Sequence, residues 1–126
     1  MGFLSSAFAA AMPQTAVRQR DVATRRRRYA CDKATLLTWE DDEGIHRFEL
    51  CVKERMSEHV MSWDADKGML HTFMSGGNAL RATPQQVRNR ATLAEQALEA
   101  LERANAGPDL WVHFFILSAC EKRSVI

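Results

Sequence analysis

The sequence predicts an α+β domain: a four-stranded antiparallel β-meander followed by one long amphipathic helix and a C-terminal apolar strand, with a short N-terminal helical arm. Three observations lead to this prediction. Two hairpin patterns occupy the middle of the chain, a strong helix-start signature follows them, and an apolar, arginine-rich segment precedes them. The 126 residues fit one small domain. We expect residues 1–29 to form the arm and residues 30–126 the single domain.

The arm begins with an alanine-rich stretch in which Phe3, Leu4 and Phe8 recur at helical spacing. We expect a short helix that ends before Pro13, because the residue before a proline avoids helical backbone. A second helical stretch, with a sparser apolar face, is expected at residues 14–27. Short helices are marginal in water, so the arm should need a surface to pack on.

The middle of the chain carries the strand signals. Runs of β-branched, aromatic and aliphatic residues flank two turns that contain Gly44 and Gly68, and Gly44 should supply the positive φ that the first turn needs. The residues from Ser75 to Asn78 are expected to end the sheet. The expected strands are residues 34–39, 45–53, 59–63 and 69–74.

Pairing about these turns predicts cross-strand neighbours. In the first hairpin Leu37 is expected near Phe48, and in the second His71 is expected opposite Met61. His59 then shares a sheet face with His71, an acceptable geometry for two ligands of one metal ion. The spacing indicates no third ligand, so we expect no metal site.

The best local signature follows the meander. Thr83, Pro84 and Gln86 form a helix start, with a threonine cap, a proline in the first turn and a glutamine that reaches back to the cap. One long helix is expected from there until Gly107 and the proline after it. Residues 110–117 are continuously apolar and are expected to form a central strand, although a buried helix gives the same pattern. The apolar stripe of the long helix is Val87, Ala91, Ala94, Leu98 and Leu101.

The net charge of +1 divides unevenly along the chain. Residues 1–30 hold six arginines against one aspartate, a net charge of +5, whereas residues 31–80 hold five basic and ten acidic side chains, a net charge of −5. A cationic arm joined to an acidic body can bind an external anion, its own body or a neighbouring copy. The composition does not indicate which of these three the arm binds.

The three cysteines, Cys31, Cys51 and Cys120, are widely spaced, and the sequence contains no CxxC motif. This pattern supports neither a disulfide framework nor a zinc site, and it favours a reducing compartment. The apolar runs are shorter than the roughly 18 to 20 residues of a membrane-spanning helix. The positive charges follow the N-terminal apolar run, in the reverse of the order in a secretory signal. We therefore expect a soluble, intracellular protein.

No motif predicts a catalytic centre. The sequence has no GxSxG, HExxH or phosphate-binding glycine loop. Cys51 and His46 are expected on opposite faces of one strand, and the turn at Asp64 lacks the ligand positions of a calcium loop. We expect no cofactor, metal or small-molecule substrate and favour a non-enzymatic protein, although a site assembled from distant residues would leave no such motif.

The favoured function is a protein-interaction or assembly subunit whose arm docks on a protein partner or a neighbouring protomer in a homo-oligomer. The alternative is a phosphate-directed module whose arginines bind nucleic acid or an anionic membrane surface. A loose N-myristoylation pattern at Gly2 would add a second membrane signal. The expected partner-binding residues are Phe3, Leu4, Phe8, Arg18, Arg20, Arg25, Arg26, Arg27 and Arg28.

Overall fold

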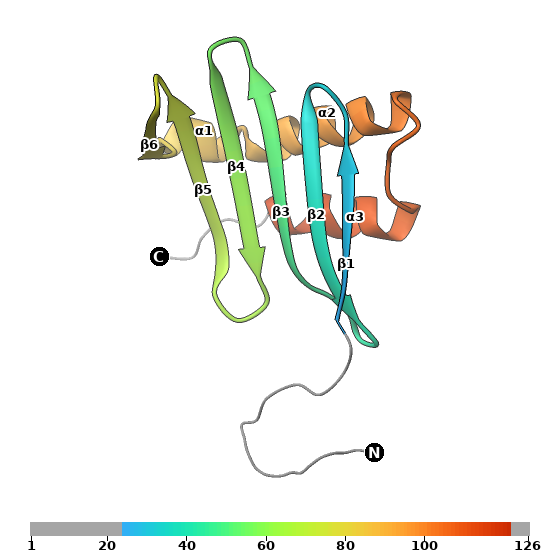
Figure 1. The fold of residues 1–126 in the computed structure, drawn as a ribbon. Coiled ribbons are helices and arrows are strands. Elements are labelled where there is room, and N and C mark those ends of the chain that lie inside the picture. The colour runs from blue at the N-terminus through green and yellow to red at the C-terminus, as the bar shows by residue number, and fades with distance from the viewer. Residues whose placement is uncertain (1–23, 122–126) are drawn as a thin grey trace.

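The computed structural model describes residues 24–121, which form a six-stranded antiparallel sheet with three helices against one of its faces (Figure 1). Each strand pairs with the next along the chain. The α+β class is confirmed, but the predicted four-stranded meander with one long helix and a C-terminal strand is wrong. The elements are β1 (Arg25–Ala30), β2 (Ala34–Asp41), β3 (Gly44–Glu54), β4 (Ser57–Asp64), β5 (Gly68–Ser75), β6 (Asn78–Arg81), α1 (Pro84–Arg88), α2 (Arg90–Arg103) and α3 (Leu110–Glu121).

The four strands expected from the sequence are β2 to β5, each slightly longer than its pattern. Gly44 has a φ of 118°, which confirms that the first turn uses a backbone conformation that side chains disfavour. His71 lies opposite Met61, as predicted for the second hairpin. In the first hairpin Leu37 lies opposite Glu49 instead of near Phe48, since a register shift between Trp39 and Glu40 moves the pairing by one residue.

Two strands were missing from the prediction. Residues expected to end a helical stretch instead form β1, which pairs along its whole length with β2 and buries part of Tyr29 against the core. At the other edge, Gly76 and Gly77 have φ angles of 59° and 84°. Two successive positive φ angles make a tight hairpin turn, so the chain reverses into β6 instead of leaving the sheet.

The helix start at Thr83 is confirmed. The Thr83 hydroxyl accepts a hydrogen bond from the Gln86 amide, and the Gln86 side chain accepts one from the Thr83 amide. The predicted single helix is divided at Asn89, which ends α1 and precedes α2. Beyond the break, the Arg90 side chain is buried and its Nε donates to the Cys120 carbonyl at the end of α3. A buried arginine thus satisfies a carbonyl that the helix end leaves without an internal partner.

Residues 110–117 belong to a helix and not to a strand. The amides of Val112 and His113 both donate to the Asp109 carbonyl, which begins α3. The buried side chains recur at helical spacing along one face. An apolar run of eight residues fits a strand or a helix, but the repeat continues through residue 121 and only the longer window shows it. The buried residues of α3 are Val112, Ile116, Ala119 and Cys120.

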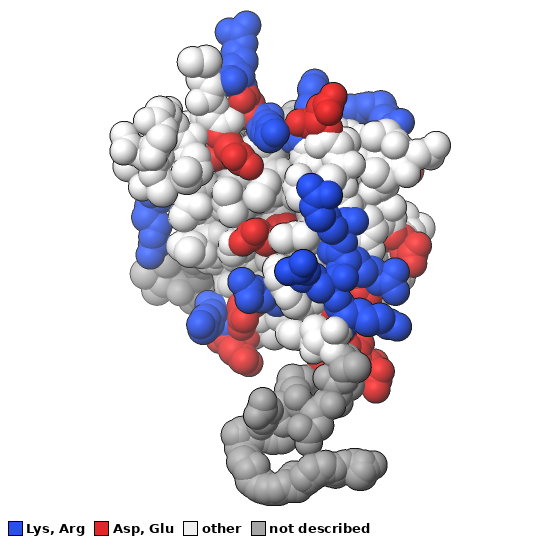
Figure 2. Space-filling model, viewed as in Figure 1, with Lys and Arg blue, Asp and Glu red and all other residues white. Residues whose placement is uncertain are grey.

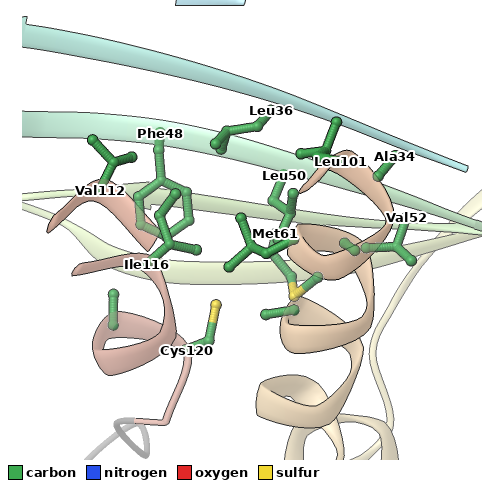
Figure 3. Packing of buried hydrophobic residues seen from close by; sticks show 14 of the residues in the cluster. Ala34, Leu36, Phe48, Leu50, Val52, Met61, Leu101, Val112, Ile116 and Cys120 are labelled. Atoms are coloured by element: carbon green, nitrogen blue, oxygen red, sulfur yellow. The ribbon is translucent and has the colours of Figure 1, made fainter. Parts of the chain in front are cut away.

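The hydrophobic core lies between the sheet and the helices (Figure 3). Leu36, Phe48 and Leu50 project from neighbouring strands towards Leu101 of α2 and Ile116 of α3. Phe48 also stacks on a tryptophan of β4 and meets a phenylalanine of α3 edge to face. Within residues 24–121, no helix is long and apolar enough to cross a membrane.

Candidate functional site

The two faces of the sheet differ in what covers them. The helices lie behind the sheet in Figure 1, and the face turned towards the viewer carries none of the described elements. We call the helix side the covered face and the opposite side the open face. Since successive side chains of a strand alternate between faces, the strand register assigns each functional residue to one side or the other.

The arginines at residues 25–28 form most of β1, an exposed edge strand. Arg27 lies opposite Thr38, whose side chain is buried, so Arg25 and Arg27 project on the covered face. Arg26 and Arg28 project on the open face. The sequence predicted one cationic cluster, but the pleat divides it into two pairs. A strand of charged residues also protects the sheet edge against pairing with another chain.

On the covered face, Arg27 is committed to an internal partner. Its Nε lies 3.5 Å from a carboxylate oxygen of Glu40, which is only 5% exposed and also accepts a hydrogen bond of 2.9 Å from the Thr38 hydroxyl. Burial, and then the Glu40 carboxylate, raise the pKa of the neighbouring Tyr29. Arg27 is therefore paired inside the fold, with half of its side chain still exposed.

On the open face, two arginines flank a tryptophan in one row of the sheet. Arg26 lies opposite Trp39 in β2, and Trp39 lies opposite Arg47 in β3. The Arg47 guanidinium sits over the Trp39 ring, 4.5 Å from its centroid. We call these residues, together with Arg28 in the adjacent row, the arginine row. Figure 2 shows the basic side chains gathered over β1 on this face.

Beside the arginine row, the open face carries both apolar and polar side chains. Leu37 and Val60 are half-buried, and Leu70 is 43% exposed. Glu49 and Ser62 stand between Leu37 and Leu70 in one row of the sheet. Figure 2 shows an uncharged area over β4 and β5 on this side of the molecule. The mixture is typical of an antiparallel sheet with one side in water, so partly exposed apolar residues lie among polar ones on this face.

The cysteines do not form a reactive centre with the histidines. Burial, and then the Glu49 and Glu58 carboxylates, raise the pKa of Cys51 to about 11. Burial also raises the pKa of Cys120 to about 12. A thiol with a raised pKa remains protonated at neutral pH and is a poor nucleophile or metal ligand. Each of these cysteines therefore acts as a small packing residue.

Two histidines form a buried hydrogen-bonded chain on the covered face. His59 Nε2 lies 3.1 Å from a Glu54 carboxylate oxygen, and His59 Nδ1 lies 2.9 Å from His71 Nε2. If the carboxylate is ionised it can only accept, so His59 donates through Nε2 and His71 donates to His59 Nδ1. The second nitrogen of His71 is buried without a hydrogen-bond partner among residues 24–121.

This histidine pair is poorly suited to metal binding or acid–base chemistry at neutral pH. Burial, followed by the nearby His59 and Arg90, lowers the pKa of His71 to about 4. The direct contact between the rings uses the nitrogens that would otherwise point at a shared ion. Residues 24–121 contain no cluster of three or more His, Cys, Asp or Glu side chains with metal-ligand geometry.

A cavity of about 260 Å³ lies between α2 and the end of the sheet. Its lining includes the apolar residues Val52 and Leu93 and the basic residues Lys33 and Arg103. Glu54 also lines it, with its carboxylate hydrogen-bonded to His59. Both signs of charge are present, so the cavity by itself selects no ligand class.

Several predicted partner-binding residues lie outside the described part of the chain: Phe3, Leu4, Phe8, Arg18 and Arg20. The described arginines are brought into one strand, but only Arg26 and Arg28 share the open face. Trp39 and Arg47 were not predicted to take part. Arg47 was expected on the polar side of its strand, whereas the predicted register placed Trp39, like Leu37, on the core face. Only the observed register shows that both residues stand in one row with Arg26 on the open face.

Comparison of the chain with protein-family models, with curated proteins and with solved structures finds no match.

Proposed function

We propose that the protein is a non-enzymatic interaction subunit that binds an acidic protein partner through the open face of its sheet. The observation that carries the proposal is the arginine row, with the partly exposed apolar side chains of Leu37, Val60 and Leu70 on the same face. Guanidinium groups form bidentate, charge-assisted hydrogen bonds with carboxylates, and the apolar side chains supply burial. Interfaces are typically enriched in arginine and aromatic residues, as the arginine row is.

The charges on the open face favour a different protein over a second copy of this chain. Two copies packed face to face would place β1 over either the partner's β1 or its β6. In the first arrangement arginines meet arginines. In the second they meet the open-face residues Ala79 and Arg81, which offer no carboxylate. Like charges placed together across an interface are costly, so the first arrangement is disfavoured, and the second provides no counter-ion on β6 for the β1 arginines.

The same arginines suggest a phosphate-directed module as the second candidate. Trp39 favours it, because bases stack on aromatic rings. The Arg47 guanidinium already lies over that ring, which leaves less of it for a base to stack on. We therefore favour the acidic protein partner. Cys31, Cys51 and Cys120 form no disulfide with one another, which is compatible with a reducing, intracellular compartment, and we include this compartment in the proposal.

The test uses fluorescence anisotropy with a labelled peptide of alternating glutamate and leucine, read on the full chain. We expect the double variant Arg26→Glu, Arg47→Glu to weaken binding at least about tenfold, equivalent to about 1.4 kcal/mol. The matched control reverses Arg88 and Arg103, which lie at the last turns of α1 and α2. It should leave the affinity unchanged.

Single-stranded DNA and phosphatidylserine vesicles are measured in parallel at about 50 mM and about 200 mM salt. Tighter binding of DNA or vesicles than of the acidic peptide, with a steep salt dependence, would replace the proposal with the phosphate-directed function. Equal weakening by the control variant would show that only net charge matters and would refute the open-face site.

A further inference from the structure

A second unpartnered surface lies on α3, away from the open face of the sheet. Leu110, Trp111 and Phe114 are 68%, 50% and 59% exposed. Phe114 lies four residues after Leu110 and three after Trp111, so the three share one side of the first turns of the helix, opposite the buried residues of α3. We call these three residues the α3 stripe. Tryptophan and phenylalanine grouped in this way on a surface typically mark a contact site.

The size of the α3 stripe limits what can cover it. At these exposures the three side chains present on the order of 350 Å² of apolar surface, given roughly 150 to 250 Å² for each large side chain. A stable interface between two folded proteins needs about 800 Å² from each partner. The α3 stripe alone is too small for a dimer, but it matches one face of a short helix.

The same chain supplies such a segment within reach. Residues 3–12 carry Phe3, Leu4 and Phe8 at helical spacing. Asp109, just before α3, is close enough to Tyr29 of β1 to raise the pKa of its hydroxyl. The start of α3 therefore lies beside the strand that follows the N-terminal segment. Tyr29 is about 13 Å along β1 from Arg25, and residues 13–24 can span up to about 40 Å.

We propose that residues 3–12 dock on the α3 stripe of their own chain. The aromatic and leucine side chains of the segment cover Trp111 and Phe114, which removes both apolar surfaces from water. A tethered segment of this length has an effective local concentration in the millimolar range, so it occupies a small site that a free partner of equal affinity leaves empty. The arm then covers the helix side of the molecule, and the open face stays available.

The inference is tested by hydrogen–deuterium exchange with mass spectrometry on the full-length protein. We expect amides in residues 3–12 to exchange at least about tenfold more slowly than unstructured peptide amides. A tenfold slowing means that the segment is docked about 90% of the time. Phe8→Ser should abolish this protection and speed exchange in the first turns of α3. A thermal unfolding curve of Phe8→Ser checks that the sheet and helices remain folded in this variant.

A second variant, Trp111→Ser, should remove the protection of residues 3–12 from the other side of the contact. Leu80→Ser is the matched control, since Leu80 is 54% exposed on β6 and is an apolar surface residue outside the α3 stripe. Light scattering is recorded on the same samples. A monomer with a protected segment supports the proposal. Unprotected residues 3–12, protection insensitive to Trp111→Ser, or protection seen only in a dimer would overturn it, and none of these results bears on peptide binding by the open face.

Discussion

The covered and open faces of the sheet are built from the same strands, yet their charged side chains have different surroundings. On the covered face, Arg27 is paired with buried Glu40, and the Glu54 carboxylate is hydrogen-bonded to His59. On the open face, Arg26 lies in a row with Trp39 and Arg47, and the carboxylate that ends this row, Asp64, accepts hydrogen bonds from the amides of its own turn. Adjacent arginines of β1 thus have different roles, which the alternation of the strand decides.

The difference teaches where specificity for an external partner can arise. A charge that is already paired inside the fold gains little from a partner, because its electrostatic interaction is satisfied before binding. A charge beside uncovered apolar surface gains both a counter-ion and desolvation when a partner arrives. Each of the following predictions contrasts the two faces.

The largest contrast concerns packing. Phe48 is fully buried on the covered face, so Phe48→Ala should lower the free energy of unfolding by about 3 to 5 kcal/mol through lost burial and a cavity. Leu37→Ala on the open face removes only half-buried surface and should cost about 1 kcal/mol. Urea unfolding at neutral pH measures both. Equal costs would mean that something covers the open face as well.

Acid should lower the free energy of unfolding through His71, a buried residue of the covered face. The pKa of His71 falls from 6.5 to about 4 on folding, mainly because the imidazole is buried. The unfolded chain therefore binds this proton more tightly. The stabilising contribution is complete above pH 6.5 and is lost as the pH falls towards about 4. The loss is about 3 kcal/mol.

Urea unfolding between pH 7 and pH 4 tests this prediction on the wild type and on His71→Leu. Other groups titrate in the same range, so the quantity of interest is the difference between the two pH profiles. The variant should lose less stability on acidification than the wild type. Parallel profiles would show that the histidine pair does not sense pH.

The neighbouring arginines of β1 offer an internal comparison. Arg27→Ala leaves Glu40 buried with fewer partners and should cost about 0.5 to 1 kcal/mol, since the arginine itself is half-exposed. Arg26→Ala, one residue away on the open face, should change stability by less than about 0.5 kcal/mol. Thermal unfolding of both variants measures the difference. A larger cost for Arg26→Ala would reverse the assignment of the two faces.

The smallest expected effect on stability is at Leu70. Leu70→Ser exchanges a partly exposed apolar residue on the open face and should change the free energy of unfolding by less than about 0.5 kcal/mol. The same variant should weaken binding of the acidic peptide several-fold, because the open face then has less apolar surface to bury against the peptide. Unchanged peptide binding would restrict the binding site to the arginine row.

Much of the central meander was predictable because hairpins are local. The turn at Gly44 and the capping box at Thr83 each depend on a few consecutive residues, and both are confirmed. The two edge strands, β1 and β6, were missed because no local signal reveals them. β1 has no apolar alternation to reveal it, and β6 follows a Gly76-Gly77 turn that is a hairpin signal only if the next few residues pair.

The candidate site was harder to predict than the strands. The arginine cluster was identified from its charge, but its division between two faces required the β1–β2 register. Trp39 and Arg47 gave no sequence signal, since they come from different strands and meet only when those strands pair. A shift of one residue moves every side chain of a strand to the other face, so an approximate register cannot define such a site.

The sequence by itself determined the local features of this protein: four strands, their turns, the capped start of the helical region and the concentration of arginine near residue 25. The tertiary structure alone decided that residues 110–121 form a helix, which residues line the open face, and that α3 exposes an aromatic stripe. Local features follow from the conformational preferences of neighbouring residues. Which faces remain uncovered depends on how elements far apart in the chain pack, and no short window of sequence contains that information.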